Sequence, residues 1–103
     1  MNSKFYSFLN ITRKSGNLLI GYNKCEDAIK HGKMSLVMIT EDLSQNSKDK
    51  FTKYCCDRNI KIVEEVNKDE LNAYLCSKEV KIIGITDKNM SNKLLELWKA
   101  ANN

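Results

Sequence analysis

The sequence contains no proline and only four glycines among its 103 residues. It also lacks low-complexity runs and internal repeats, so no linker divides the chain. A chain of this length can bury one modest core. Its 42% hydrophobic and 29% charged residues are typical of an ordinary globular protein. We therefore expect a single domain over residues 1–103.

Long apolar runs are missing as well. The apolar stretches are short, such as LLI at 18–20 and LVMI at 36–39, whereas a membrane-spanning helix needs about 20 residues. The first ten residues, MNSKFYSFLN, lack the apolar core of a signal peptide. We expect a cytoplasmic protein with no membrane partner.

The motifs of nucleotide chemistry are also missing. No GxGxxG follows a strand and no GxxxxGK precedes a serine or threonine, so neither dinucleotide binding nor nucleotide hydrolysis is supported. The one histidine, His31, lies just before Gly32 in the last turn of a predicted helix, where an imidazolium suits the helix dipole. We favour this structural role over catalysis. No enzyme activity and no cofactor are expected.

Cysteine pairs with metal-binding spacing are absent. The four cysteines, at 25, 55, 56 and 76, form no CxxC pair, and a structural zinc site needs pairs at fixed spacing. Cys55 and Cys76 fall on the apolar faces of predicted helices. We therefore expect buried, reduced thiols and no metal.

What the sequence does contain is a regular alternation of helical and strand patterns. Helices are expected at 4–14, 24–31 and about 47–58, and two more follow the caps Asn67 and Ser91. Strands are expected at 18–22, 35–40, 60–64 and 80–86. This alternation implies a central sheet with helices on both faces. The predicted fold is α/β, a three-layer α/β/α sandwich with a central, mostly four-stranded mixed sheet.

Three of these helices carry capping signals. In GYNKCEDAIKHG, residues 21–32, Asn23 can cap the helix and Glu26 can reach back to the cap's own N–H. Gly32 supplies the left-handed residue that ends it. Asn67 with Glu70, and Ser91, are the expected caps of the last two helices.

The positive charge is concentrated near the N-terminus. Residues 1–34 hold six basic and two acidic groups, whereas the remaining 69 residues hold eleven of each. A local basic patch suits a polyanionic partner, although a solvated basic face is the alternative.

The run TRKSGNLLIGYNKCEDAIKHGKMSLVMITEDLS, residues 12–44, resembles the start of small bacterial proteins of the YlxQ/YbxF type. These belong to the superfamily of ribosomal protein L-seven-Ae, whose members bind kink-turn RNA. The family pattern is Ala-Arg-Lys-Ala-Gly-Lys, then Gly-x-Asn-Glu-x-x-Lys, then a strand ending in Ala-Glu-Asp. The positions that fit it are Arg13, Lys14, Gly16, Gly21, Asn23, Glu41 and Asp42. DELNAYLCSKEVKIIGITDKNMSNKL resembles the second half, and the resemblance spans residues 6–98.

The resemblance implies an RNA interface in two segments. In the family, the start of the second helix and the loop before it enter the widened groove of an RNA kink and read tandem sheared G·A pairs. The corresponding residues here are Arg13, Lys14, Asn17, Gly21, Tyr22, Asn23, Lys24 and Asp27. The loop after the last strand packs around a flipped-out base and corresponds to Thr86, Asp87, Lys88, Asn89 and Met90. Ile85 and Met90 would supply apolar surface to that base.

Several residues depart from the family pattern. Lys24 stands where the family has Glu, Asp27 where it has Lys, and Asn17 where Lys is common. Asp27 cannot donate a hydrogen bond to guanine O6 or N7. In the first helical turn, however, its negative charge would stabilise the helix by interacting favourably with the helix dipole. Asn72 and Cys76 fill positions that are glycine in many relatives.

The leading hypothesis is an RNA-binding module, a monomer that binds kink-turn or ribosomal RNA, with the ribosome as a candidate partner. The alternative is a protein of the same fold that has lost kink-turn recognition and acts through protein contacts. Its candidate surface is the helix at 47–58, with Lys48, Lys50, Lys53 and Arg58. A third, weaker hypothesis is a small-ligand protein that uses Glu41 and Asp42 at a strand end, where acids more often form turns.

Overall fold

The computed structural model describes residues 3–102 and confirms the predicted alternation. The helices are α1 (Ser3–Lys14), α2 (Tyr22–Lys30), α3 (Gln45–Asp57), α4 (Lys68–Leu75) and α5 (Lys88–Ala101), and the strands are β1 (Leu18–Ile20), β2 (Leu36–Thr40), β3 (Lys61–Val66) and β4 (Ile82–Ile85). None of the helices in this range is long and apolar enough to cross a membrane.

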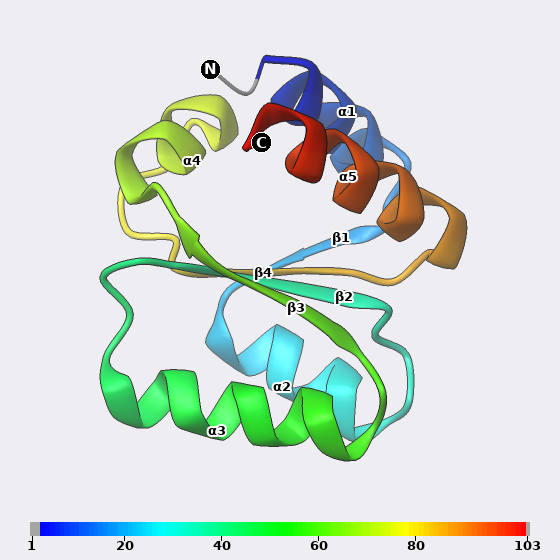
Figure 1. The fold of residues 1–103 in the computed structure, drawn as a ribbon, viewed down its shortest axis with the longest axis vertical. Helices are drawn as coiled ribbons and strands as arrows, with labels where there is room; N and C mark the ends of the chain where they lie inside the picture. Colours follow the sequence, from blue (N-terminus) through cyan, green and yellow to red (C-terminus); the bar gives the residue numbers. More distant parts are fainter. Residues whose placement is uncertain (1–2, 103) are drawn as a thin grey trace.

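The four strands form one mixed sheet in the order β1-β4-β2-β3. β4 runs antiparallel to both of its neighbours, β1 and β2, whereas β2 and β3 are parallel. Helices α1, α4 and α5 cover one face of the sheet and α2 and α3 cover the other (Figure 1). The three-layer α/β/α sandwich with a four-stranded mixed sheet is therefore confirmed.

The two helical layers enclose separate cores on either side of the sheet. Leu9, Leu71 and Leu94 belong to the core under α1, α4 and α5, and Ile29 and Phe51 to the core under α2 and α3. Every residue of β2 and β4 is buried, which explains why their sequences are continuously apolar instead of alternating.

The cap of α2 differs from the prediction. The helix begins at Tyr22 with Gly21 as its N-cap, at φ 104°, and no side chain caps it. Asn23 therefore lies within the first turn, and the prediction of an Asn23–Glu26 capping box is wrong. The predicted end is confirmed, since Gly32 has the left-handed φ of 69°.

The start of α5 is also different. Asp87 caps this helix by accepting a hydrogen bond from the Met90 N–H at 2.8 Å. Ser91, the predicted cap, is buried inside the helix. Residues 88–90 are thus the first turn of α5 rather than a loop, which shortens the predicted loop at 86–90. The prediction for α4 is confirmed, because the Asn67 side chain accepts from the Glu70 N–H at 2.9 Å.

The cysteines divide into two groups. Cys25 and Cys55 are buried as predicted, and burial raises the pKa of their thiols to about 12 and about 11. Cys56 and Cys76 are exposed, so the expectation of burial is wrong for these two. Cys76 ends α4 as its C-cap, in the left-handed conformation at φ 55°.

Replacing Cys76 with glycine should stabilise the protein. The left-handed conformation crowds a Cβ atom and costs a non-glycine residue about 1–2 kcal/mol, part of which the greater freedom of glycine in the unfolded chain offsets. We expect the free energy of unfolding to rise by about 0.5–1 kcal/mol in urea denaturation. Cys56→Ala, at an exposed helical cysteine, is the matched control and should leave the unfolding midpoint nearly unchanged. A lower midpoint for Cys76→Gly would contradict the strain argument.

Candidate nucleic-acid interface

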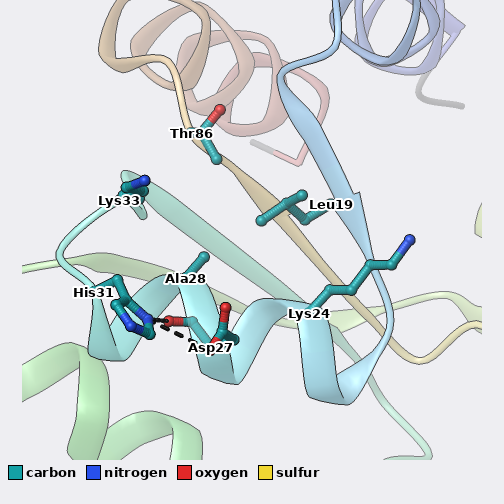
Figure 2. A pocket seen from close by; sticks show the side chains of 7 residues that line it. All are labelled: Leu19, Lys24, Asp27, Ala28, His31, Lys33 and Thr86. Carbon is teal, nitrogen blue, oxygen red and sulfur yellow. Dashed lines mark hydrogen bonds and ion pairs between the residues drawn. The ribbon is translucent and has the colours of Figure 1, made fainter.

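A groove of about 490 Å³ lies between α2, the edge strand β1 and the segment that follows β4 (Figure 2). We call it the α2 groove. Its lining residues are Leu19, Lys24, Asp27, Ala28, His31, Lys33 and Thr86.

The helical repeat explains how α2 forms one wall. Lys24, Ala28 and His31 are spaced four and three residues apart, with Asp27 beside Ala28, so they follow one another along a single helix face. Ala28 is buried and Leu19, from β1, is half-buried. The groove therefore has an apolar floor and a charged wall.

The charges of the α2 groove alternate along its length. Lys24 extends from one end of the helix face and Lys33 lies beyond the other, with Asp27 between them (Figure 2). The Asp27 side chain is 76% exposed, and its carboxylate lies 3.4 Å from Nδ1 of His31. Within residues 3–102, neither Lys24 nor Lys33 makes a salt bridge. Both ammonium groups are thus available to an anionic ligand.

A polar corner adjoins the groove at Thr86. The Thr86 N–H donates to the Asn17 carbonyl at 3.0 Å, and the Thr86 hydroxyl lies 3.3 Å from Asn17 Oδ1. The Asn17 amide also approaches the sulfur of Met90 at 3.7 Å. Because Thr86 lines the groove too, the fold brings α2 and the segment after β4 to one continuous surface.

Other predicted site residues lie elsewhere. Ile85 is fully buried in the core, so it cannot offer the apolar surface expected for a flipped-out base. Arg13 donates from Nη1 to the Leu75 carbonyl at 2.8 Å and so holds the end of α4. Gly21 and Tyr22 line a different hollow beside Leu43, and Tyr22 packs edge-on against Phe51 at 4.9 Å.

The remaining predicted residues are at the surface. Lys14 is exposed at the end of α1, and Asn23 is exposed in the first turn of α2. Lys88 and Asn89 are exposed in the first turn of α5, behind the capping residue Asp87. None of these five residues lines the α2 groove.

Sequence reasoning missed four lining residues, namely Leu19, Ala28, His31 and Lys33. The spacing of Lys24, Ala28 and His31 could have indicated a common helix face. Leu19 and Lys33 carry no such signal, because their place depends on how β1 and the turn after α2 pack against the helix.

The basic N-terminal third is not one patch. Its cations divide between α1 and the region of α2, which lie on opposite faces of the sheet (Figure 1). Lys4, Arg13 and Lys14 belong to α1, whereas Lys24, Lys30 and Lys33 belong to α2 and the turn after it. Proximity in sequence therefore overstated the local charge around α2.

The cations of α3 mostly contact the chain itself. Glu26 accepts hydrogen bonds from the Tyr54 hydroxyl and from Lys50, each at 2.9 Å. The bond from Lys50, followed by that from Tyr54, lowers the pKa of the Glu26 carboxyl, and the bond to Glu26 raises the pKa of Lys50. Lys48 donates to the Glu41 carbonyl at 2.9 Å, and Arg58 lies over the Tyr54 ring. Three of the four cations of the alternative protein-binding surface are thus engaged.

The acids after β2 serve as a structural junction. Asp42 accepts from the Thr40 hydroxyl at 2.7 Å and lies 3.6 and 3.5 Å from Lys68 and Lys81. The bond from Thr40 and the two ammonium charges lower its carboxyl pKa. Across residues 3–102, no group of three or more His, Cys, Asp or Glu side chains is arranged to hold a metal ion.

Comparisons with known proteins agree with this fold. Among 210 matching chains of solved structures is "The structure of a protein with unknown function from Bacillus halodurans C". It superposes with a TM-score of 0.86 at 26% sequence identity, over 93% of this chain and 97% of that one. No curated protein matches the chain.

The family comparison is more specific. A family model matches residues 3–95, which extend from the first described residue of α1 well into α5. This match supports an RNA-binding module of ribosomal type. The chain belongs to the Ribosomal protein L7Ae/L30e/S12e/Gadd45 family.

Proposed function

We propose that this protein binds structured RNA of the kink-turn type through the α2 groove and the adjoining corner of Asn17, Thr86 and Met90. The observation that supports this most is that residues of α2 and Thr86, in the segment after β4, line the same groove. The Thr86 N–H also donates to the carbonyl of Asn17 in the adjoining corner. These are the two segments that the resemblance to kink-turn proteins assigned to RNA. We also propose that the chain is a YlxQ-like member of the family, with ribosomal RNA as the candidate target.

The chemistry of the groove suits a bent RNA. The major groove of regular A-form RNA is too narrow for side chains, whereas a kink opens it and exposes the guanine edges. Lys24 can donate to guanine O6 or N7, and the exposed amide of Asn23 lies beside it in the same helical turn. Lys33, beyond the far end of α2, is placed to contact phosphate.

Removing the two groove cations should lower the affinity for RNA and make that affinity less sensitive to salt concentration. For Lys24→Ala with Lys33→Ala, the slope of log K against log salt should fall by roughly 0.7–0.9 for each phosphate that the variant no longer neutralises. Electrophoretic mobility shifts with a kink-turn RNA at several salt concentrations would measure both effects. Unchanged affinity and slope would show that the groove does not hold the RNA.

The matched control removes two lysines from the far side of the molecule. Lys53 and Lys61 are exposed on α3 and on β3, which is the sheet edge opposite β1. Lys53→Ala with Lys61→Ala lowers the net charge equally but should change the affinity much less. If the control weakened binding as strongly as the groove variant, the interface would lie elsewhere.

A further inference from the structure

A second groove, of about 380 Å³, lies between α1 and α5. These two helices pack side by side in the layer on the other face of the sheet from α2 (Figure 1). We call it the α1–α5 groove. Its lining residues are Ser3, Lys4, Ser7, Phe8, Ile11, Lys93 and Leu97.

The floor of the α1–α5 groove is apolar and borders the core of this helical layer. The inward face of α1 consists of Phe5, Tyr6, Leu9 and Thr12, all of them buried. Phe8 and Ile11 of the same helix line the groove together with Leu97 of α5. Phe8 and Leu97 are partly buried and also pack against this core. Ile11 is 53% exposed, the one large hydrophobic side chain within residues 3–102 with such exposure. A contiguous apolar surface bordered by polar residues, rather than one exposed side chain, is typical of a protein-binding site.

The net charge of the two helices around this groove is positive. Helices α1 and α5 carry six basic side chains and one acidic side chain, Glu96. The whole chain has 17 basic and 13 acidic groups, which leaves eleven basic and twelve acidic groups outside these two helices. The entire positive excess of the protein therefore lies on helices α1 and α5, and Lys4 and Lys93 line the groove itself.

We infer that the α1–α5 groove binds an amphipathic helix of a partner protein, with apolar anchors on one face and acidic residues beside them. Helices recognised in grooves insert apolar side chains at i, i+3 or i+4, and i+7. Phe8, Ile11 and Leu97 would receive those anchors, while Lys4 and Lys93 would pair with the flanking carboxylates. This inference does not depend on RNA binding, because the two grooves lie on opposite faces of the sheet.

Nucleic acid and lipid fit this groove less well. An exposed isoleucine gains little binding energy from contact with phosphates. Bases stack on aromatic or arginine side chains. Apart from Phe8 and two serines, the side chains that line this groove are aliphatic or lysine. A membrane surface would favour a protruding apolar face rather than a hollow between two helices. A helical peptide with acidic flanks matches both the shape and the charge.

A display selection on the full-length protein would test the inference. The probe is a library of helical peptides with a fixed leucine stripe, in which all other positions vary among Glu, Lys and Ser. We expect enrichment of glutamate-rich peptides. A selected peptide should bind Ile11→Glu at least tenfold more weakly in fluorescence anisotropy, because Ile11 is on the surface and its replacement should preserve the fold. The double variant Lys4→Glu with Lys93→Glu should instead enrich lysine-rich peptides.

The matched control reverses two charges away from the groove. Lys53→Glu with Lys61→Glu changes the net charge by the same amount, on α3 and β3. This variant should still select glutamate-rich peptides, and it should bind the selected peptide within about twofold of the wild-type affinity.

Three results would overturn the inference. One is no enrichment of acidic peptides over a composition-matched scrambled set. A second is equal binding of the selected peptide to wild type and to Ile11→Glu. The third is that Lys4→Glu with Lys93→Glu abolishes binding to kink-turn RNA or to phosphatidylserine vesicles while peptide selection is unaltered, which would assign the surface to RNA or to lipid.

Discussion

Replacing Asp27 with lysine should raise the affinity for a kink-turn RNA by about fivefold or more. Asp27 occupies the middle of the α2 groove and is largely exposed, where its carboxylate repels phosphate and cannot donate to a base. A good donor pair to a guanine edge is worth about 1–3 kcal/mol of discrimination, and about 1.4 kcal/mol corresponds to tenfold in affinity. Titration of the variant against a kink-turn RNA would measure the gain.

The fold should tolerate this substitution. Asp27 lies four residues before His31, the C-cap of α2, so it is not in the first helical turn that the sequence suggested. Near the C-terminus a lysine suits the helix dipole better than an aspartate does, with an effect of about 0.3–1 kcal/mol. The stability loss that replacing an aspartate in the first helical turn would cause should therefore not appear, and the melting temperature should stay close to that of the wild type.

Asp27→Asn is the matched control, because it removes the negative charge without adding a cation. Its gain in RNA affinity should be smaller than that of Asp27→Lys. The gain of the lysine variant should also shrink when the G·A pairs of the RNA are disrupted. An equal gain on a plain duplex would indicate general charge attraction and not recognition at this helix.

Replacing Phe51 with alanine should lower the free energy of unfolding by about 3–5 kcal/mol, the usual cost of such a truncation in a core. Phe51 is fully buried and packs edge-on against Tyr22 and Tyr54, at ring distances of 4.9 and 5.8 Å. Its removal would leave a cavity between α3 and the start of α2. A typical domain is stable by only about 5–15 kcal/mol. The variant should therefore unfold at a much lower urea concentration than the wild type.

The neighbouring Thr52 supplies the control, because it is exposed on the same helix. Thr52→Ala should change the free energy of unfolding by less than about 0.5 kcal/mol. A decrease of less than about 1 kcal/mol for Phe51→Ala would contradict the description of this core.

The fold was predictable because its signals are local and repeated. Continuous apolar runs at residues 36–39 and 82–85 indicate strands covered on both faces, and the structure buries all of them. The Asn67–Glu70 spacing likewise predicted the cap of α4 correctly. Each of these patterns depends on a few neighbouring residues and on one face of one element.

The N-terminal caps of α2 and α5 were mispredicted because, at each helix start, more than one residue could serve as the cap. Asn23 has the right side chain for a cap, but the helix begins two residues after Ile20, and Gly21 provides the turn at φ 104°. At α5, Asp87 and Ser91 are both good caps by residue type. The end of β4 decides between them, since the chain must leave the sheet at Ile85.

The site was only partly predictable because it depends on contacts between distant segments. Nothing in the sequence around Arg13 shows that its guanidinium bonds to the Leu75 carbonyl, 62 residues away. The basic N-terminal third similarly splits between two faces once α1 and α2 pack on opposite sides of the sheet. Thr86, by contrast, was assigned to the interface by the resemblance, and in the structure it lines the α2 groove.

The most direct test of RNA recognition is to titrate the isotope-labelled protein with three RNAs and follow its amide resonances. The RNAs are a kink-turn, the same RNA with its G·A pairs disrupted, and a plain duplex, all at one stated salt concentration. We predict tight binding of the kink-turn alone, with the largest shifts at Lys24, Asp27 and Thr86. Equal affinity for the three RNAs, or shifts confined to residues outside the α2 groove and its adjoining corner, would contradict the proposed recognition of kinked RNA.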